Sequence, residues 1–555
     1  MDRESMLTDY NEMDEHETGS NKSVPQTPVE KWAQNNVPEG DDTTFNLALA
    51  FGQPFALGIA FWRGAFISIL IGCLMGFIGL GFFNAFEKGF ETWIGESYKE
   101  NLEHAHYDKP WKGESIWVAW MTGGGFIIGC IKAVPCFHIP VKADGLFAEV
   151  KDKHVDPKEA PGILTISCLS LLFGFSVGPE AALGTMGGAL GTLIAEKRNL
   201  PVEERHAAAL NGMAGAMGSL FPSPILSVIL IHELSIQASK YPVNFMDSIV
   251  SGCIAATASW MVFVGFQDYT FLDSMNLPLA LYDFSDFEMW YMGSAAFMGI
   301  LGGVIGFVVL LGLGLFRRIA QTNTERLQQR FGERRGATIA TILLPTLAGF
   351  LCGVLAWALP LTLGDGTMQL KYVITKSCTN DQNDTSDNPC YDVNILVATI
   401  FAKMATLGIS LGFGCIGGQI FPCIYMGTIT AMVLNIVAPD WFPITLAVPC
   451  MAVCVAGSFV PAPICMCGIA ILVFVLGAEM TAPVFLSCIV SFLTICGTGC
   501  IQGIVIRQSQ NKAAAQQALE DKENLRREDM ESRLSRDIHK GHEALLHLKP
   551  EDGPA

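Results

Sequence analysis

The chain has 555 residues, of which 50% are hydrophobic and only 16% are charged, and its formal net charge is −18. Charged residues make up about a quarter of an ordinary soluble domain, so this composition excludes a soluble globule and favours a membrane protein. The acidic balance argues against nucleic-acid binding, which requires a basic surface.

The first 54 residues form an acidic tail, with eleven Asp/Glu against three Lys/Arg. The tail lacks the basic region and the apolar run of a signal peptide, so membrane insertion must depend on the first true span. Its composition predicts a largely disordered cytoplasmic end.

Apolar segments of roughly spanning length then follow one another almost to residue 506. They are 56–90, 115–135, 161–175, 206–238, 247–267, 287–316, 337–364, 393–412, 420–438, 444–480 and 483–506. Several are too long or too short for one straight span, and many are interrupted by Gly or Pro. Broken helices at membrane depth are tolerated where they are buried in protein or line a cavity, which favours a transporter or channel over a simple anchor.

The loops predict the orientation. Residues 317–335 hold six arginines against two glutamates, so the positive-inside rule places this loop in the cytoplasm. The loop 268–288 is acidic with no basic residue and is expected outside, as is the acidic loop between Cys378 and Cys390. Both long tails are expected in the cytoplasm.

The loop from Cys378 to Cys390 carries two signs of an external or lumenal location. The cysteines bracket a polar stretch that contains the sequon Asn383-Asp384-Thr385. A disulfide and a glycan both fit such a loop. The triplet Cys465-Met466-Cys467 could suggest a soft metal site, but no converging ligands are visible and we expect no metal.

Two pairs of motifs indicate an internal repeat. Pro179 and Pro422 each open the pattern P-x-x-x-x-G-T, and Pro224 and Pro463 each lie in the pattern S-x-x-P-x-P-I. The spacing is 45 residues from Pro179 to Pro224 and 41 residues from Pro422 to Pro463. The sequence therefore predicts two related halves, as in many transporters. Spacing alone leaves a parallel or an inverted arrangement open.

Residues 174–179 read GFSVGP and residues 417–422 read GGQIFP, so each brings glycine backbone next to a proline suited to a first helical turn. Helix N-termini attract anions through unpaired N–H groups and the helix dipole. We expect the two segments to lie within about 15 Å of each other, with the amides of Val177-Gly178 and Gly418-Gln419-Ile420 pointing at one shared cavity. The candidate pore residues are Ser176, Val177, Gly178, Pro179, Gly418, Gln419, Ile420 and Phe421.

These motifs resemble those of the CLC family of chloride channels and transporters. Gly178-Pro179 looks like the end of the family's GxEGP motif, and residues 418–422 are similar to its GxFxP motif. Residues 208–234 and 456–481 resemble two later family segments, and the likeness covers most of residues 56–506. The resemblance implies an all-α membrane protein of inverted-repeat type with broken, re-entrant helices, assembled as a homodimer with one anion pathway per subunit.

The departures from the family pattern bear on proton coupling. Val177 stands where the family's gating glutamate usually stands, as it does in some members that are plain channels. Glu233 matches a glutamate common in the family, but Leu234 occupies the position of the exchangers' inner glutamate. Residues 136–140 read CFHIP where the family has GSGIP, so that motif is degraded. Ile420 replaces the Phe of GxFxP, and no tyrosine follows Tyr425.

Glu180 lies in the first turn of its predicted helix, directly after Pro179. One interpretation is a first-turn acid favoured by the helix dipole. The other is a displaced gate that competes with the anion for the same N-terminus, since an intramembrane carboxylate is a functional candidate by default. Glu233 is interpreted as a structural acid at a helix end. The sequence His232-Glu233 is not a zinc motif, because Ile236 breaks the HExxH pattern.

The sequence thus predicts a passive channel for chloride or a similar anion, embedded in the lipid bilayer, with no cofactor and no metal. The alternatives are an anion/proton exchanger that uses Glu180 and Glu233, and a non-conducting membrane scaffold. No P-loop or nucleophile elbow suggests an enzyme. The predicted domains are a tail over 1–54, a transport domain over 55–506 with halves near 55–240 and 290–506, and a charged helical tail over 507–555.

Overall fold

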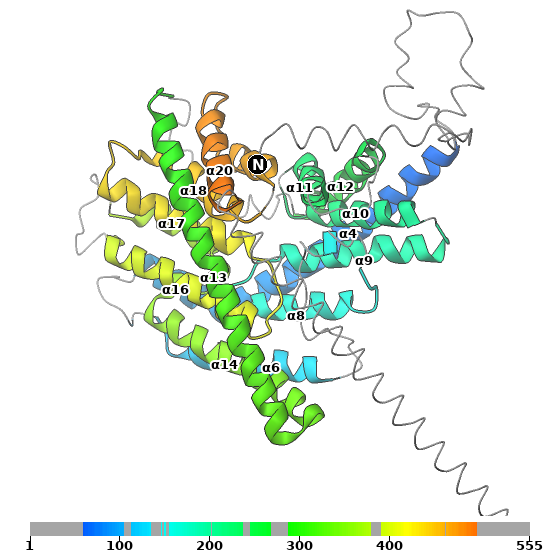
Figure 1. Ribbon diagram of the computed structural model, residues 1–555, viewed down its shortest axis with the longest axis horizontal. Helices are drawn as coiled ribbons and strands as arrows, with labels where there is room; N and C mark the ends of the chain where they lie inside the picture. The colour runs from blue at the N-terminus through cyan, green and yellow to red at the C-terminus, as the bar shows by residue number, and fades with distance from the viewer. Residues whose placement is uncertain are drawn as a thin grey trace, which may run out of the picture. The chain divides into compact units, whose positions relative to one another are not determined.

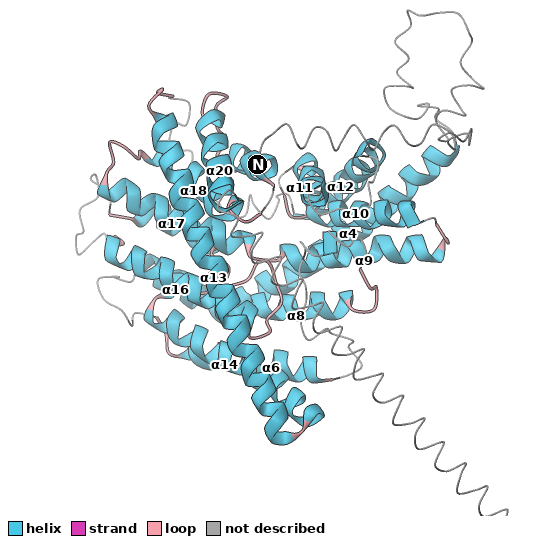
Figure 2. Ribbon diagram, in the orientation of Figure 1, coloured by secondary structure: helices cyan, strands magenta, loops and turns pink. Residues whose placement is uncertain are grey.

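The computed structural model describes residues 59–104, 111, 113–134, 146, 149–150, 155–200, 202–221, 223–236, 245–267, 287–378, 390–460 and 462–496. Within these ranges the regular elements are helices, and the extended backbone is limited to two isolated bridges (Figure 2). The chain divides into two units, Met1–Phe66 and Ile67–Ala555. Of the first unit, the structure describes only residues 59–66, which form the start of helix α4.

Most helices follow the predicted apolar segments, but Glu96–His104, Glu180–Lys197 and Thr367–Lys376 lie outside them, and residues 317–335, predicted as a loop, are helical except at Gly332. The first group is α4 (Ile59–Phe90), η1 (Glu91–Gly95), α5 (Glu96–His104), α6 (Ile116–Ala133), α8 (Ala160–Leu172), α9 (Glu180–Lys197), α10 (Val202–Gly218), α11 (Pro224–Ile236) and α12 (Phe245–Gln267). The second group is α13 (Tyr291–Phe331), α14 (Glu333–Ala358), η5 (Pro360–Thr362), α15 (Thr367–Lys376), α16 (Val393–Gly412), α17 (Ile420–Val437), α18 (Ile444–Gly457), α19 (Pro463–Val473) and α20 (Thr481–Cys496). Two of the long predicted segments, 206–238 and 444–480, each form two helices, because a turn that ends in proline interrupts each of them.

Seven of the described helices are long and apolar enough to cross a membrane. They lie at Gly64–Glu103, Ile116–Ala133, Ile249–Gln267, Tyr291–Phe331, Glu333–Ala358, Val393–Gly412 and Ile420–Val437. Several others are apolar but too short, as expected for helices that enter a bilayer without crossing it.

Glycines set the close packing of α6 against α14, which lie side by side in Figure 1. A Cβ on Gly125 would lie 2.0 Å from the Pro345 carbonyl oxygen, and one on Gly349 would lie 2.0 Å from the Met121 carbonyl oxygen. Small residues spaced four apart let two backbones approach this closely in a membrane. The high glycine content therefore serves helix contact here.

The five helices α8 to α12 are repeated in α16 to α20. The same neighbours pack together in both sets, and α9 and α17 have 18 residues each. Gly174 and Gly414 both have positive φ, +79° and +107°, and both come just before the start of these helices. The equivalent positions are 240 residues apart (414 minus 174, 420 minus 180).

This register corrects the alignment of Pro179 with Pro422. The structural counterpart of Pro179 is Gln419, so the sequence alignment of the two P-x-x-x-x-G-T motifs was wrong by three residues. Proline is tolerated throughout the first helical turn, because those N–H groups have no intrahelical partner. A proline therefore marks the start of a helix without fixing its register.

The two halves are related by a local two-fold axis. Gly178 N–H donates to the Gly418 carbonyl oxygen at 2.8 Å, and Gly418 N–H donates to the Gly178 carbonyl oxygen at 2.6 Å. A reciprocal, antiparallel pair between equivalent residues requires a half-turn between the halves. α9 ends at Lys197-Arg198, a basic end that the positive-inside rule assigns to the cytoplasm, whereas α17 ends near Trp441, whose ring contacts Trp290 beside the acidic loop expected outside. The repeat is therefore inverted.

The orientation can be tested with two single-cysteine labels at exposed positions. Arg334→Cys at the start of α14 is expected to react with a membrane-impermeant maleimide only after the cells are permeabilised. Asn394→Cys at the start of α16 is expected to react in intact cells. Labelling of Arg334→Cys from outside would show that the topology is reversed. The unsubstituted protein measures the background from its own cysteines.

Candidate functional site

The two glycine-rich segments meet at the reciprocal Gly178–Gly418 pair, in agreement with the expected short separation. The first segment follows the turn at Gly174 and the second follows the turn at Gly414, where positive φ is accessible to glycine without strain. α9 and α17 begin directly beyond the pair, at Glu180 and Ile420. Two helix N-termini are thus brought together in the interior of the bundle.

The side chain of Glu180 reaches the N-terminus of α17. Its Oε1 accepts a hydrogen bond from the Ile420 N–H at 2.7 Å. Only 2% of Glu180 is exposed, and Oε2 is buried with no hydrogen-bond partner. The space for this carboxylate exists because residues 178 and 418 are glycines: a Cβ on Gly178 would lie 2.1 Å from Oε2, and one on Gly418 would lie 1.9 Å from Oε1.

The expectation of five amides around one cavity is wrong in part. The Gly178 and Gly418 amides bond each other's residues, and the Val177 amide donates to the Phe175 carbonyl oxygen. Of the remaining two, the Ile420 amide donates to the Glu180 carboxylate. The N-terminus of α17 therefore already binds a negative group, as a helix N-terminus can.

The other candidate residues are buried around this point. Val177 is fully buried and lies against Gly417, where an added Cβ would be 2.6 Å from that of Val177. The Ser176 hydroxyl is buried with no partner, so it is a polar group directed into the interior. Pro179 caps the start of α9, and Phe421 is buried in the first turn of α17.

Glu233 of α11 caps the N-terminus of α19, a helix in the other half of the repeat. Its Oε1 accepts from the Ile464 N–H at 3.0 Å and its Oε2 accepts from the Cys465 N–H at 2.8 Å, so α11 holds the N-terminus of α19. Both oxygens are therefore engaged. Such charge-assisted caps stabilise a helix end by about 1–2 kcal/mol.

Replacement of Glu233 by leucine is expected to destabilise the protein, because it leaves the Ile464 and Cys465 amides without acceptors. The melting temperature of the purified protein should fall by a few degrees. Glu233→Gln keeps one acceptor oxygen, so its melting temperature should lie between those of the wild type and Glu233→Leu. A matched Glu204→Leu on exposed α10 surface is the control. An unchanged melting temperature in Glu233→Leu would contradict the capping role.

Sequence reasoning missed two buried charges near this site. Asp365 lies in the loop between η5 and α15, and Lys403 lies in α16 with no exposed surface. Lys403 Nζ donates to the carbonyl oxygens of Thr362 and Gly364 at 3.2 and 2.5 Å. A lysine inside the apolar segment 393–412 is the signal that could have identified this cluster, because intramembrane charges are costly and usually paired.

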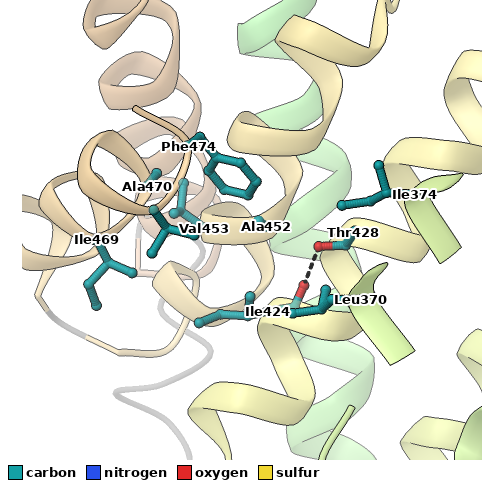
Figure 3. Close-up of a pocket in the computed structure, with 10 residues that line it drawn as sticks. Leu370, Ile374, Ile424, Thr428, Ala452, Val453, Ile469, Ala470 and Phe474 are labelled. Carbon is teal, nitrogen blue, oxygen red and sulfur yellow. Dashed lines mark hydrogen bonds between the residues drawn. The ribbon is translucent and has the colours of Figure 1, made fainter. Parts of the chain in front are cut away.

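An apolar crevice lies on another face of α17, between α15, α18 and α19. Figure 3 shows Leu370, Ile424, Val453 and Phe474 lining it, with the Thr428 hydroxyl turned to the Ile424 carbonyl. Since its lining is almost entirely apolar, the crevice is unsuited to an inorganic anion. Among the described residues, no group of three or more His, Cys, Asp or Glu is placed to hold a metal ion.

Cys378 and Cys390 are joined by a disulfide, beside the bridge between Ser377 and Tyr391. The sequon at Asn383 lies outside the described residues, as do the degraded motif 136–140 and both tails.

A buried meeting of inverted half-helices, with an anionic group on a helix N-terminus, defines the class of inverted-repeat membrane transport proteins. Residues 142–495 match the family model described as voltage gated chloride channel. This match covers more than half of the chain. The protein therefore belongs to the voltage gated chloride channel family and is a multi-pass integral membrane protein.

Solved structures share this fold. A slow cyanobacterial Cl−/H+ antiporter has a TM-score of 0.60 and 18% identity, over 80% of this chain and 98% of that one. A CLC-type fluoride/proton antiporter has a TM-score of 0.51 and 16% identity, over 78% and 95%. Among curated proteins, the "Putative ion-transport protein YfeO" of Escherichia coli O7:K1 is 26% identical over 297 residues, which is 53% of this chain and 62% of the relative. The match thus spans less than two thirds of that relative's length.

Proposed function

We propose that the protein is an anion channel for chloride or a similar small inorganic anion, with its narrowest point at the N-terminus of α17. The observation that carries this proposal is the Glu180 carboxylate on the Ile420 N–H. Its Oε1 stands in for the transported anion, because a carboxylate oxygen and a halide both bind backbone N–H groups at a helix N-terminus. Glu180 acts as the gate: while it occupies this position, the anion is excluded.

Transport is proposed to be passive. Val177 and Leu234 cannot carry a proton, and the Glu233 carboxylate is engaged by two amides of α19. A stoichiometric exchanger requires an acid that meets the anion path and a second that delivers cytoplasmic protons to it. Glu180 offers the first, and Leu234 stands where the family's exchangers carry the second.

The alternative is an anion/proton exchanger in which Glu180 carries the proton. It is favoured by the buried, unpartnered Oε2, which a proton would suit better than a negative charge. The solved structures of similar fold include two proton-coupled antiporters, which is consistent with this alternative. A third candidate is a membrane scaffold that retains the fold and conducts nothing.

Reconstitution of the purified protein in liposomes distinguishes the three. A passive channel gives chloride efflux that starts when valinomycin is added, and a reversal potential that follows the chloride gradient and ignores a pH gradient. Proton uptake driven uphill by chloride, and lost in Glu180→Gln, would establish the exchanger instead. Absence of flux for chloride, nitrate and fluoride would support the scaffold.

Gly418→Ala provides a test within the gate itself. The added Cβ would overlap Glu180 side-chain atoms at 1.9 Å, and a flexible side chain can move away. Anion flux is therefore expected to rise, and Gly418→Ala should add little to Glu180→Ala in the double variant. Normal flux in a well-folded Gly418→Ala protein would contradict the gate.

Gly427→Ala is the matched control on the same helix. Its Cβ would lie 2.1 Å from the Met451 backbone oxygen, so α17 and α18 would have to separate. Overpacking of this kind costs about 1–3 kcal/mol. A lower melting temperature without a rise in flux is expected.

The transport unit is proposed to comprise residues 55–506, with the halves near 55–240 and 290–506, and to work as a homodimer with one pathway per subunit. Light scattering of the detergent-solubilised protein, corrected for bound detergent, measures the assembly.

A further inference from the structure

The loop that begins with η5 and leads into α15 is held by side chains at five carbonyl groups in a row. Each carbonyl oxygen from Pro360 to Gly364 accepts a hydrogen bond from a buried side chain. The donors are the Tyr98 hydroxyl to Pro360 at 3.0 Å, the Tyr425 hydroxyl to Leu361 at 2.9 Å, Lys403 Nζ to Thr362 at 3.2 Å and to Gly364 at 2.5 Å, and Gln369 Nε2 to Leu363. They come from α5, α17, α16 and α15, so four helices fix one short loop.

The same loop is attached to the turn that precedes the Glu180 helix. The Gly364 N–H donates to the Gly174 carbonyl oxygen at 2.8 Å. Leu363 packs on this turn as well, since a Cβ added to Gly174 would lie 2.9 Å from Leu363 Cδ1. From Gly174 the chain runs through the glycine-rich segment to Glu180 at the start of α9. The loop therefore fixes the point from which this segment departs.

Tyr425 attaches α17 to the other side of the loop. Its side chain is buried and packs directly on Gly366, where an added Cβ would lie 2.4 Å from Tyr425 Cγ. Tyr425 follows Ile420 by five residues in α17 (425 minus 420), and the Ile420 amide is the group that holds Glu180. Hydrogen bonds between residues four apart make this stretch of helix one rigid piece. A bond that holds Tyr425 therefore also positions the Ile420 amide.

Two links thus join the two sides of the gate. The direct link is the reciprocal pair between Gly178 and Gly418. The indirect link runs from the Gly174 turn through the loop to Tyr425. The bond from the Ile420 amide to the Glu180 carboxylate lies between the starts of α9 and α17, so both links determine its length and direction. Hydrogen bonds weaken steeply when the donor turns away from the acceptor.

We propose that Tyr425 is a positioning residue for the gate, and that Tyr98, on the neighbouring carbonyl, acts through the same loop. The Tyr425 hydroxyl holds α17 where the Ile420 amide meets the Glu180 carboxylate. When that hydroxyl is removed, α17 can shift from the loop, the carboxylate holds the amide less well, and the anion reaches the helix N-terminus more often. This inference rests on the proposed anion channel with Glu180 as its gate.

Tyr425→Phe tests the inference, because it removes the hydroxyl and keeps the ring. Chloride flux from liposomes at neutral pH is expected to rise by about 2- to 10-fold, the factor that one net hydrogen bond can contribute. Tyr98→Phe should raise flux in the same direction. In the Glu180→Ala background, Tyr425→Phe should leave flux unchanged, since no carboxylate remains to be positioned. A purely structural role would change flux by the same factor in both backgrounds.

Tyr391→Phe is the matched control. Its hydroxyl is also buried and donates to a backbone carbonyl, that of Leu102 at 3.2 Å, which lies outside the loop. The variant should keep wild-type flux.

Three outcomes would overturn the inference. They are wild-type flux in a folded Tyr425→Phe protein, an equal rise in the Glu180→Ala background, and an equal rise in Tyr391→Phe. If Tyr425→Phe does not fold, Tyr98→Phe is measured in both backgrounds and judged in the same way. Failure of the proposed function is distinct, because neither the wild type nor Glu180→Ala would then conduct. If Glu180→Ala conducts more than the wild type while Tyr425→Phe and Tyr98→Phe do not, the gate stands and its positioning by the loop is wrong.

Discussion

Glu180→Ala is expected to raise anion flux by about 10- to 100-fold at neutral pH and to make it insensitive to pH. The carboxylate accepts a hydrogen bond from the Ile420 amide at 2.7 Å. Hydrogen bonds to charged groups contribute about 1.5–3 kcal/mol, and about 1.4 kcal/mol corresponds to a factor of ten in occupancy. Alanine cannot reach α17, so the N-terminus is open to the anion.

The comparison with Glu180→Gln separates charge from shape. Glutamine keeps an acceptor oxygen and the length of the side chain but loses the negative charge, so its flux should lie between wild type and alanine. Glu196→Ala, at the exposed far end of α9, is the matched control and should leave flux unchanged. Flux equal to wild type in a folded Glu180→Ala protein would mean that Glu180 is a static first-turn acid.

Lys403→Met is expected to have the largest effect on stability. Lys403 is fully buried, and its removal leaves the Thr362 and Gly364 carbonyl oxygens without this donor and Asp365 without a cation. Each buried acceptor left without its donor costs about 1–3 kcal/mol. The temperature at which the detergent-solubilised protein loses its monodisperse peak should fall by roughly 5–15 °C.

The double variant Lys403→Met/Asp365→Asn tests the origin of that loss. If the cost comes from an unbalanced Asp365 charge, the second substitution should recover part of the stability. Lys371→Met on the exposed face of α15 is the control for loss of a lysine and should have little effect. A double variant less stable than Lys403→Met would assign the cost to the loop carbonyls and the Tyr425 contact instead.

The sequence predicted the helices well because apolar length and glycine or proline breaks are local signals. It also identified both segments that meet at Gly178 and Gly418, because glycine and proline at a helix start can be recognised from the sequence alone. It misaligned Pro179 with Pro422, because proline can occupy any position of a first helical turn. It left the role of Glu180 open, since the partner of that carboxylate is 240 residues away.

Asp365 and Lys403 show a different kind of limit. Each is a single charge in an apolar or loop context, and they come near each other only because Lys403 of α16 bonds the loop before α15. Charge within an apolar helix could have identified Lys403 as important. The sequence could not show which acid lies near Lys403. Several acids occur in or beside apolar segments, and only the packing of the helices decides which of them comes close.

The half-turn that relates Gly178 to Gly418 carries an evolutionary consequence. In an ancestor built from two identical copies, every residue near this axis would have faced its own twin, so an acid at the position of Glu180 would have met the same acid from the other copy. Two like charges at such a buried contact repel. In the present chain the twin of Glu180 is Ile420, which offers only its amide. A single chain that holds both halves lets these two positions differ, so that one carboxylate faces one amide across the contact.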